Sequence, residues 1–182
     1  MGELGVCRRQ ADSHVNPSAP IDRATLAALE RFPALLQEYY SAIPTGFENW
    51  RPASWHGIPS EPFTPIEQLC HVRDIEIDGY HDRFARTRCD DAPVLVNIDG
   101  EALARERGYA SADATKVLQE FRKARVQTLA LIDTFSAAEL DRRAVFDGAT
   151  ITLRGLVHML CSHDQQHLSG MQWLLARIYA AA

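Results

Sequence analysis

The stretch TLRGLVHMLCSHDQQHLSGMQWLLARIY (residues 152–179) predicts one long helix with a single apolar face. Thr152 is a residue type that caps helices at the N-terminus. At about 100° per residue, the large apolar side chains fall in one stripe along this helix. The stripe contains Leu156, Leu160, Met171, Leu174, Leu175 and Ile178. We therefore expect this face to pack into the core of a helical protein.

Three further segments have apolar residues at helical spacing, and no segment shows a convincing period-2 alternation. The three predicted helices lie at about residues 21–43, 64–88 and 112–135. Four long helices that share one core predict an all-α, antiparallel four-helix bundle. We expect a single bundle domain over residues 21–182, preceded by a flexible N-terminal arm over residues 1–20.

Several residues mark where the predicted helices begin or bend. Thr64 is expected to cap the second helix, with Pro65 at its first position and Glu67 closing a capping box. Ser111 is the expected cap of the third helix. Pro33 should kink or restart the first helix near its middle.

Long loops are expected between the first and second helices and between the second and third. The first loop, PTGFENWRPASWHGIPSEPF (residues 44–63), is rich in proline and long enough to pack on its own. Trp50 and Trp55 should hold it against the bundle. The second loop contains a short helical piece, DGEALARERG (residues 99–108).

Charge and composition exclude some classes of function. The formal net charge of −5 argues against general nucleic-acid binding, which needs a basic surface. No apolar run reaches the roughly 18 residues of a membrane span. The four cysteines, Cys7, Cys70, Cys89 and Cys161, have no C-x-x-C pairing, so they predict reduced thiols in a cytoplasmic protein.

Two histidines of the last helix share its apolar face. His163 and His167 are four residues apart and lie about 40° from each other around the axis, whereas His158 lies about 140° away. Buried imidazoles without partners cost roughly 1–3 kcal/mol each. A divalent metal ion satisfies both rings at once, so the pair predicts chelation.

Further ligands should come from a facing helix, and the second helix offers His71 at the edge of its apolar face. Asp74 lies within about 60° of His71 and is a candidate to orient the imidazole or to act in acid–base chemistry. Asp164 is the other catalytic candidate, although it could equally pair with an arginine of a neighbouring helix. His81 is expected at the surface.

Two known classes of metal-binding protein have helical motifs that these residues do not match. Zincin proteases carry H-E-x-x-H, whereas this chain has Asp164 in place of the glutamate. Di-iron carboxylate bundles need two Glu-x-x-His pairs, and the nearest approach here is Asp78-x-x-His81. The sequence argues against both.

The motifs RP (residues 51–52), FTPIEQLCHVRDIE (residues 63–76) and LVHMLCSHDQQHLSGMQWLL (residues 156–175) together resemble the DinB/YfiT-like superfamily of four-helix bundles. In that family, one histidine of the second helix and an H-x-x-x-H pair of the last helix hold a divalent metal. The resemblance implies that His71, His163 and His167 are the metal ligands. Many thiol-transferase members read H-x-x-H-H-R-x-Q, which this chain lacks after the pair.

The resemblance implies a metal-dependent transferase or hydrolase that acts on a small molecule, with a low-molecular-weight thiol as a candidate co-substrate. Three imidazoles leave coordination positions open, and zinc or nickel suits them best. The alternative is a non-enzymatic metal-binding or stress-response bundle with a closed site. Members of the superfamily often pair, and the Trp-containing loop carries apolar surface, so we expect a homodimer.

Overall fold

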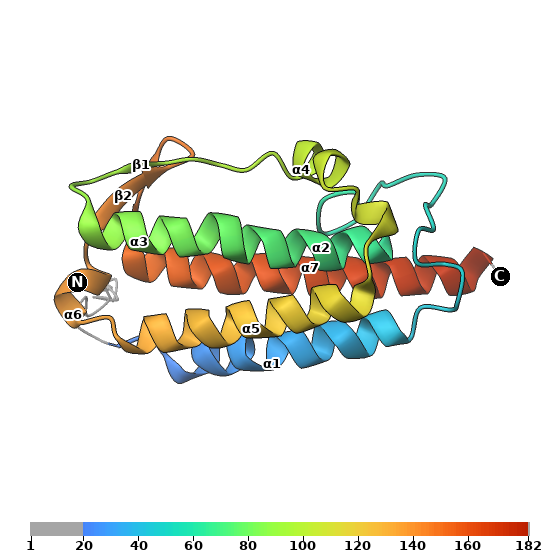
Figure 1. Ribbon diagram of the computed structural model, residues 1–182, viewed down its shortest axis with the longest axis horizontal. Helices are drawn as coiled ribbons and strands as arrows, with labels where there is room; N and C mark the ends of the chain where they lie inside the picture. Colours follow the sequence, from blue (N-terminus) through green and yellow to red (C-terminus); the bar gives the residue numbers. More distant parts are fainter. Residues whose placement is uncertain (1–19, 182) are drawn as a thin grey trace, which may run out of the picture.

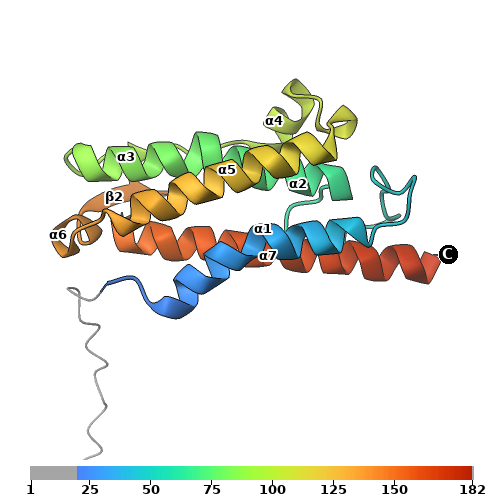
Figure 2. The same ribbon diagram turned by 60° about the horizontal axis from the view of Figure 1, so that its bottom comes forward.

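The computed structural model describes residues 20–181, so all but the last residue of the expected N-terminal arm lies outside the described part. Four long helical segments run side by side and form a four-helix bundle, as the sequence predicts (Figures 1 and 2). They are α1 (Arg23–Ser41), the continuous run α2–η1–α3 over residues 65–89, α5 (Ala114–Asp133) and α7 (Leu153–Ala181). Helix α1 packs against α5 and α7, and α2 packs against the same two helices. Within residues 20–181, no helix is both long and apolar enough to cross a membrane.

The helix starts agree with the sequence in two cases and differ in one. The backbone N–H of Thr64 donates to Glu67 over 2.9 Å, and Thr152 Oγ1 accepts from the N–H of Gly155 over 3.0 Å. The expectation that Ser111 caps α5 is wrong, because Asp113 accepts from the backbone of the first turn and α5 begins at Ala114. A carboxylate can accept two backbone N–H groups at a helix start, which makes Asp113 the better cap.

Helix α1 continues through Pro33, so it does not restart there, and Figure 2 shows that α1 changes direction along its length. The second long helix is interrupted instead, where α2 (Pro65–Asp74) passes through a π-helical turn, η1 (Ile75–Tyr80), into α3 (His81–Cys89). A π turn adds about one residue to a helix turn and rotates everything beyond it around the axis.

A small three-stranded sheet at one end of the bundle was not expected from the sequence (Figure 1). Its strands are β1 (Val94–Leu95), β2 (Arg143–Phe146) and β3 (Ala149–Thr152), with β1 parallel and β3 antiparallel to β2. The β2–β3 turn is Asp147-Gly148, both with positive φ, which is typical of a tight hairpin. An Asp-Gly pair between two four-residue strands is a hairpin signal that is easily missed among long helices.

Both long loops are present, and the second carries the short helical piece that the sequence indicates. The second loop contains α4 (Gly100–Glu106) and a 3₁₀ turn, η2 (Tyr109–Ser111), and α6 (Ala137–Leu140) precedes the hairpin. In the first loop, the Trp55 ring stacks on the Trp173 ring of α7, with centroids 6.3 Å apart and planes 21° apart. Trp50 packs against the main core. Both tryptophans therefore hold the loop as predicted.

A buried ionic network lies between the two apolar halves of the core. The Arg125 guanidinium, 2% exposed, binds Glu76 through Nε and Nη2 and Asp164 through both Nη atoms, over 2.6–3.1 Å. It also donates to the backbone oxygen of Leu29 over 2.6 Å. Thr128 donates to Glu76 over 2.6 Å. The network thereby joins all four long helical segments.

Removing the cation from this network should destabilise the protein strongly. We expect Arg125→Ala to lower the free energy of unfolding by about 3–5 kcal/mol, because two buried carboxylates lose their partner. Urea unfolding followed by circular dichroism measures this change. Arg122→Ala, on the exposed face of the same helix, is the control and should cost no more than about 1 kcal/mol. Equal effects of the two substitutions would contradict the role given to Arg125.

Candidate metal centre

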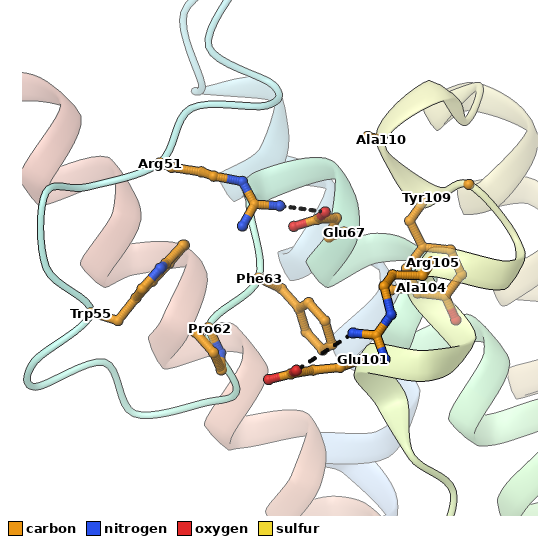
Figure 3. Close-up of a pocket in the computed structure, with 11 residues that line it drawn as sticks. Arg51, Trp55, Pro62, Phe63, Glu67, Glu101, Ala104, Arg105, Tyr109 and Ala110 are labelled. Carbon is orange, nitrogen blue, oxygen red and sulfur yellow. Dashed lines mark hydrogen bonds and ion pairs between the residues drawn. The ribbon is translucent and has the colours of Figure 1, made fainter.

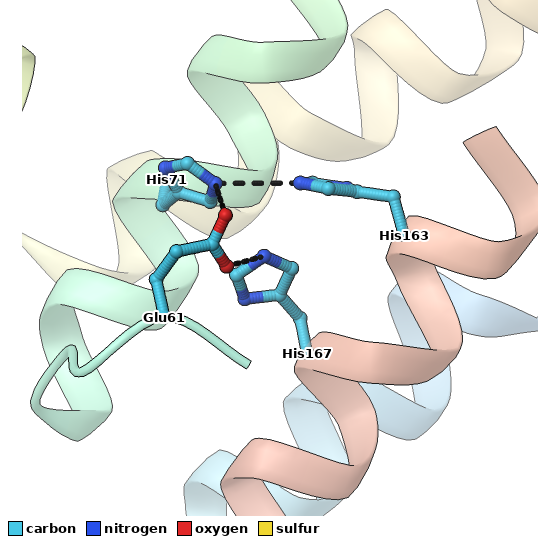
Figure 4. Close-up of side chains that lie close together, drawn as sticks. All are labelled: Glu61, His71, His163 and His167. Carbon is cyan, nitrogen blue, oxygen red and sulfur yellow. Dashed lines mark hydrogen bonds and ion pairs between the residues drawn. The ribbon is translucent and has the colours of Figure 1, made fainter. Parts of the chain in front are cut away.

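Three histidines predicted from the sequence converge inside the bundle, and a glutamate joins them (Figure 4). His71 comes from α2, His163 and His167 come from α7, and Glu61 comes from the loop before α2. One ligand atom from each residue lies within 4.8 Å of all the others. The Nε2 atoms of His71 and His163 are 3.3 Å apart. Glu61 lies 3.1 Å from His167 Nε2 and 3.7 Å from His71 Nε2.

These distances suit a small divalent ion. In a tetrahedral site with metal–nitrogen bonds of about 2.0–2.1 Å, neighbouring donor atoms are about 3.3–3.4 Å apart. The His71–His163 separation has this length, and the Glu61 contacts lie on either side of it. His167 Nε2 is buried and makes no hydrogen bond of normal geometry among the described residues, although a Glu61 carboxylate oxygen lies 3.1 Å away. A fully buried nitrogen in this position, facing three other donor atoms, fits a metal ligand.

Gln68 fixes the orientation of the His167 ring. The Gln68 side-chain N–H₂ group lies within donating distance of three oxygens, on Ser60, Glu61 and Phe63, at 2.9, 3.3 and 3.3 Å. Gln68 Oε1 therefore faces His167 Nδ1 and accepts a short hydrogen bond from its N–H group. With the proton on Nδ1, the lone pair of the ring lies on Nε2, toward the other donors.

The environment favours neutral imidazoles at His71 and His163. Burial is the largest effect on His71 and lowers its pKa to about 3, with a further contribution from the nearby His167. Burial also lowers the pKa of His163, and the rings of His167 and His71 act in the same direction. The contact with His167 is the largest effect on Glu61 and lowers the pKa of its carboxyl to about 2. Neutral imidazoles and an ionised carboxylate are the forms that bind metal.

Glu61 was not identified from the sequence, because it lies in an irregular loop where no periodicity assigns a face. The loop reaches the cluster by a close approach to α7. A methyl group on Gly170 would lie 2.2 Å from Ser60 Oγ, so only glycine leaves room for the segment next to Glu61. Gly170, three residues after His167, is the one sequence signal that could have suggested this contact.

The two acidic candidates for catalysis form their hydrogen bonds and ion pairs with residues outside the cluster. Asp74 binds Arg73 Nε at 2.6 Å, the hydroxyl of Tyr109 at 2.6 Å and Arg107 at 2.9 Å, and no hydrogen bond joins it to His71 in the described part. Asp164 binds Arg125, which was the alternative drawn from the sequence. Both carboxylates therefore take part in ion pairs, and no hydrogen bond among the described residues supports a role of Asp74 in orienting His71.

The remaining histidines and cysteines of the helices take no part in the cluster. His81 is half-buried rather than at the surface, and its Nε2 lies 2.8 Å from Thr128 Oγ1. The reason is the π turn, which moves His81 from about 80° to about 180° away from His71. His158 is exposed near Thr25, apart from the cluster as predicted. Cys70 is fully buried in the apolar core and is not a ligand.

A cavity of about 230 Å³ borders the cluster. Glu61, His71 and His163 form part of its wall. The other walls come from the π turn, the start of α3, the segment before α4, the β2–β3 turn and the solvent side of α7. The donor atoms are therefore next to a space that a small molecule could occupy.

A separate cavity of about 500 Å³ lies between the first loop, the start of α2 and the α4 region (Figure 3). Its arginines already have carboxylate partners, since Arg51 binds Glu67 at 2.8 Å and Arg105 lies 3.7 Å from Glu101. Its wall includes Phe63, two residues after Glu61. The Phe63 ring packs on the His71 ring, with centroids 4.9 Å apart. This cavity offers no cluster of metal donors among the described residues.

Comparison with known proteins agrees with the fold and with the resemblance. The profile of the DinB superfamily matches residues 28–171. A solved structure of YfiT from Bacillus subtilis matches with a TM-score of 0.75 and 18% sequence identity, over 91% of this chain and 99% of that chain. That protein is described as a probable metal-dependent hydrolase with an unusual four-helix bundle topology. No curated protein matches this chain significantly.

The first test of the site is metal content. We expect about one divalent ion per purified chain, and we expect His163→Ala or His167→Ala to abolish binding because each removes a ligand. Elemental analysis after loading with zinc or nickel measures both results. His158→Ala, on the exposed face of the same helix, should keep the ion. The site is wrong if the wild-type protein holds no metal even after saturation.

A second test concerns the hydrogen bond that orients His167. Gln68→Leu should reduce metal affinity about 10- to 100-fold, because the ring loses the acceptor that fixes its tautomer. Competition with a chromophoric chelator measures this affinity. Gln165→Leu, an exposed change on α7, is the matched control and should have no effect. A Gln68 variant with wild-type affinity would remove Gln68 from the site.

Proposed function

This chain belongs to the DinB superfamily, and from this premise we propose that it is a metal-dependent enzyme, a hydrolase or transferase, that acts on a small molecule. One observation carries the proposal: the cluster of three imidazoles and a carboxylate forms part of the wall of a 230 Å³ cavity. A purely structural site needs no such space, whereas catalysis needs room for a substrate next to the donors.

A divalent ion held by His71, His163 and His167 would act as a Lewis acid and lower the pKa of water or a thiol bound to it. Zinc or nickel suits this donor set best. The residues of the chain supply the rest. Gln68 keeps the His167 ring oriented, and Glu61, an ionised carboxylate with a half-exposed side chain, is placed to accept a proton from a group in the cavity.

A low-molecular-weight thiol is the co-substrate that we propose for a transferase reaction. Support comes from the family resemblance and from the imidazole donor set, which leaves room for a thiolate. We place this chemistry in the cytoplasm, where such thiols are abundant and an exposed cysteine such as Cys89 stays reduced.

The second candidate function is a non-enzymatic metal-binding bundle, and Glu61 is the observation that favours it. With Glu61 as a fourth ligand, three histidines and one carboxylate would complete a tetrahedral shell. The difference between the two functions is therefore whether an external ligand can reach the metal.

Cobalt substitution distinguishes the two functions. Adding 2-mercaptoethanol to the cobalt-loaded protein should produce a sulfur-to-metal charge-transfer band in the near ultraviolet, because the thiolate binds the ion directly. His71→Ala should shift this band, since it changes the ligand set. Glu61→Gln should keep the band if Glu61 acts as a base and intensify it if Glu61 blocks the position. If adding the thiol does not change the spectrum of the wild-type protein, the result would favour the non-enzymatic bundle.

We further propose that the protein forms a two-fold symmetric homodimer. Support comes from exposed apolar side chains on the described surface, including Val126 of α5 and Tyr179 near the end of α7, 67% and 64% exposed. Light scattering at micromolar concentration should give about twice the chain mass of 20.4 kDa. A mass of a single chain at that concentration would contradict the proposal.

A further inference from the structure

The wall of the cavity next to the metal cluster contains a buried arginine with no carboxylate partner. Arg83 is 4% exposed. Within residues 20–181 its guanidinium makes a long hydrogen bond, 3.4 Å from Nη2 to the backbone oxygen of Val96, and interacts with the hydroxyl of Tyr80. Its Nε is buried without a partner. Arg125, the other buried arginine of the described chain, binds two carboxylates and a backbone oxygen. A buried guanidinium without an anion is costly, and such groups are normally paired.

Two aromatic rings hold the Arg83 guanidinium in place. Its Cζ atom lies 5.0 Å from the centroid of the Tyr80 ring and 4.5 Å from that of Phe146. Contacts with ring faces stabilise a cation, but they do not use the in-plane N–H groups at the edge of the guanidinium. Nε has no partner, and a planar guanidinium held in one orientation is well suited to binding a carboxylate through two parallel hydrogen bonds, one of them from Nε.

The π turn places Arg83 on the same face of its helix as His71. In an uninterrupted α-helix the two residues would lie about 120° apart around the axis. Counting the π turn as one inserted residue reduces this angle to about 20°. Both side chains accordingly line the same 230 Å³ cavity, and the positive charge of Arg83 contributes to lowering the pKa of His163.

The charges that face the cavity favour a negative ligand once a divalent ion is bound. Arg83 adds to the charge of the ion, and Glu61 and Asp147 oppose it as the two carboxylates of the cavity wall. Asp147 is exposed at the tip of the β2–β3 turn. Burial lowers the pKa of Arg83 and outweighs the electrostatic attraction of Asp147 and Asp82, which raises it. The cavity therefore keeps a net positive charge at its inner end.

We infer that this cavity binds a small substrate through a carboxylate group, with the Arg83 guanidinium holding the carboxylate while the reacting group of the substrate faces the metal cluster. The inference rests on the proposed function and names its substrate class. Arg83 is a binding residue here, and the volume of about 230 Å³ limits the substrate to a molecule of few heavy atoms.

Two thiols of similar size provide the test. Mercaptoacetate carries a thiol for the metal and a carboxylate for Arg83, whereas 2-mercaptoethanol has a hydroxyl in place of the carboxylate. Calorimetry on the zinc-loaded protein should show mercaptoacetate binding roughly 10- to 100-fold more tightly. Arg83→Gln should remove this difference and leave the affinity for 2-mercaptoethanol within about twofold of the wild type.

Three further variants make the result specific. Arg83→Lys keeps the charge but loses the planar guanidinium, so it should retain only part of the preference for mercaptoacetate over 2-mercaptoethanol. If Arg83→Gln does not fold, Arg83→Lys is the variant used for the test. Arg86→Gln, on the same helix with a partly exposed guanidinium, is the matched control and should change nothing. Asp147→Asn should tighten mercaptoacetate binding, about two- to fivefold, because it removes a repelling carboxylate.

The outcomes separate this inference from the proposed function. If Arg83→Gln lowers the affinity for both thiols equally, Arg83 only supports the structure, and the inference would be overturned. Arg83-dependent binding of inorganic phosphate in preference to mercaptoacetate would overturn the assignment of a carboxylate. If elemental analysis finds no metal, the proposed function fails. The carboxylate site is then tested alone, by ligand-observed NMR with acetate on the metal-free wild type and Arg83→Gln, and lack of Arg83-dependent binding would overturn it.

Discussion

The Arg125 network is the interaction on which the arrangement of the bundle depends. One guanidinium on α5 binds Glu76 of the π turn, Asp164 of α7 and the backbone of Leu29 on α1. Apolar side chains can slide past one another with small losses, but buried charges must meet their partners at fixed distances. The network therefore sets the register of the long helices. Because Asp164 directly follows His163 in α7, the same register fixes where His163 and His167 lie along the bundle axis.

The π turn allows the second long helix to serve two separate parts of the interior. His71 lies before the turn and Arg83 after it, and both line the cavity, while Glu76 inside the turn faces Arg125. A regular helix would direct Arg83 about 120° away from His71. π turns recur at functional sites because they change which side chains share a face. In this chain the turn is stabilised by Glu76, whose carboxylate accepts from Arg125 and Thr128.

The parts of the site that depend on local periodicity could be predicted from the sequence. His163 and His167 share a face because four residues are about one helix turn, and the bundle follows from four such stripes. Residues whose position depends on tertiary structure could not be predicted. Glu61 lies in an irregular loop, and Arg83 reaches the cavity only through the π turn. The ion pairs of Asp74 with Arg107 and of Asp164 with Arg125 depend on tertiary structure in the same way, since helical angles do not show which arginine lies opposite.

The candidate metal donors differ in how firmly the fold holds them. The three imidazoles project from α2 and α7, which the core fixes relative to each other, whereas Glu61 lies in a loop and its side chain is 47% exposed. That loop is held near the cluster by the Trp55–Trp173 stack and by the bond from Gln68 to Ser60. Gln68 also orients His167 through its other side-chain atom, so the position of the loop and the orientation of a ligand depend on one amide. A displacement of the loop that carries Glu61 away would therefore also weaken the orientation of His167, and the cluster would respond to loop movement at two donors rather than one.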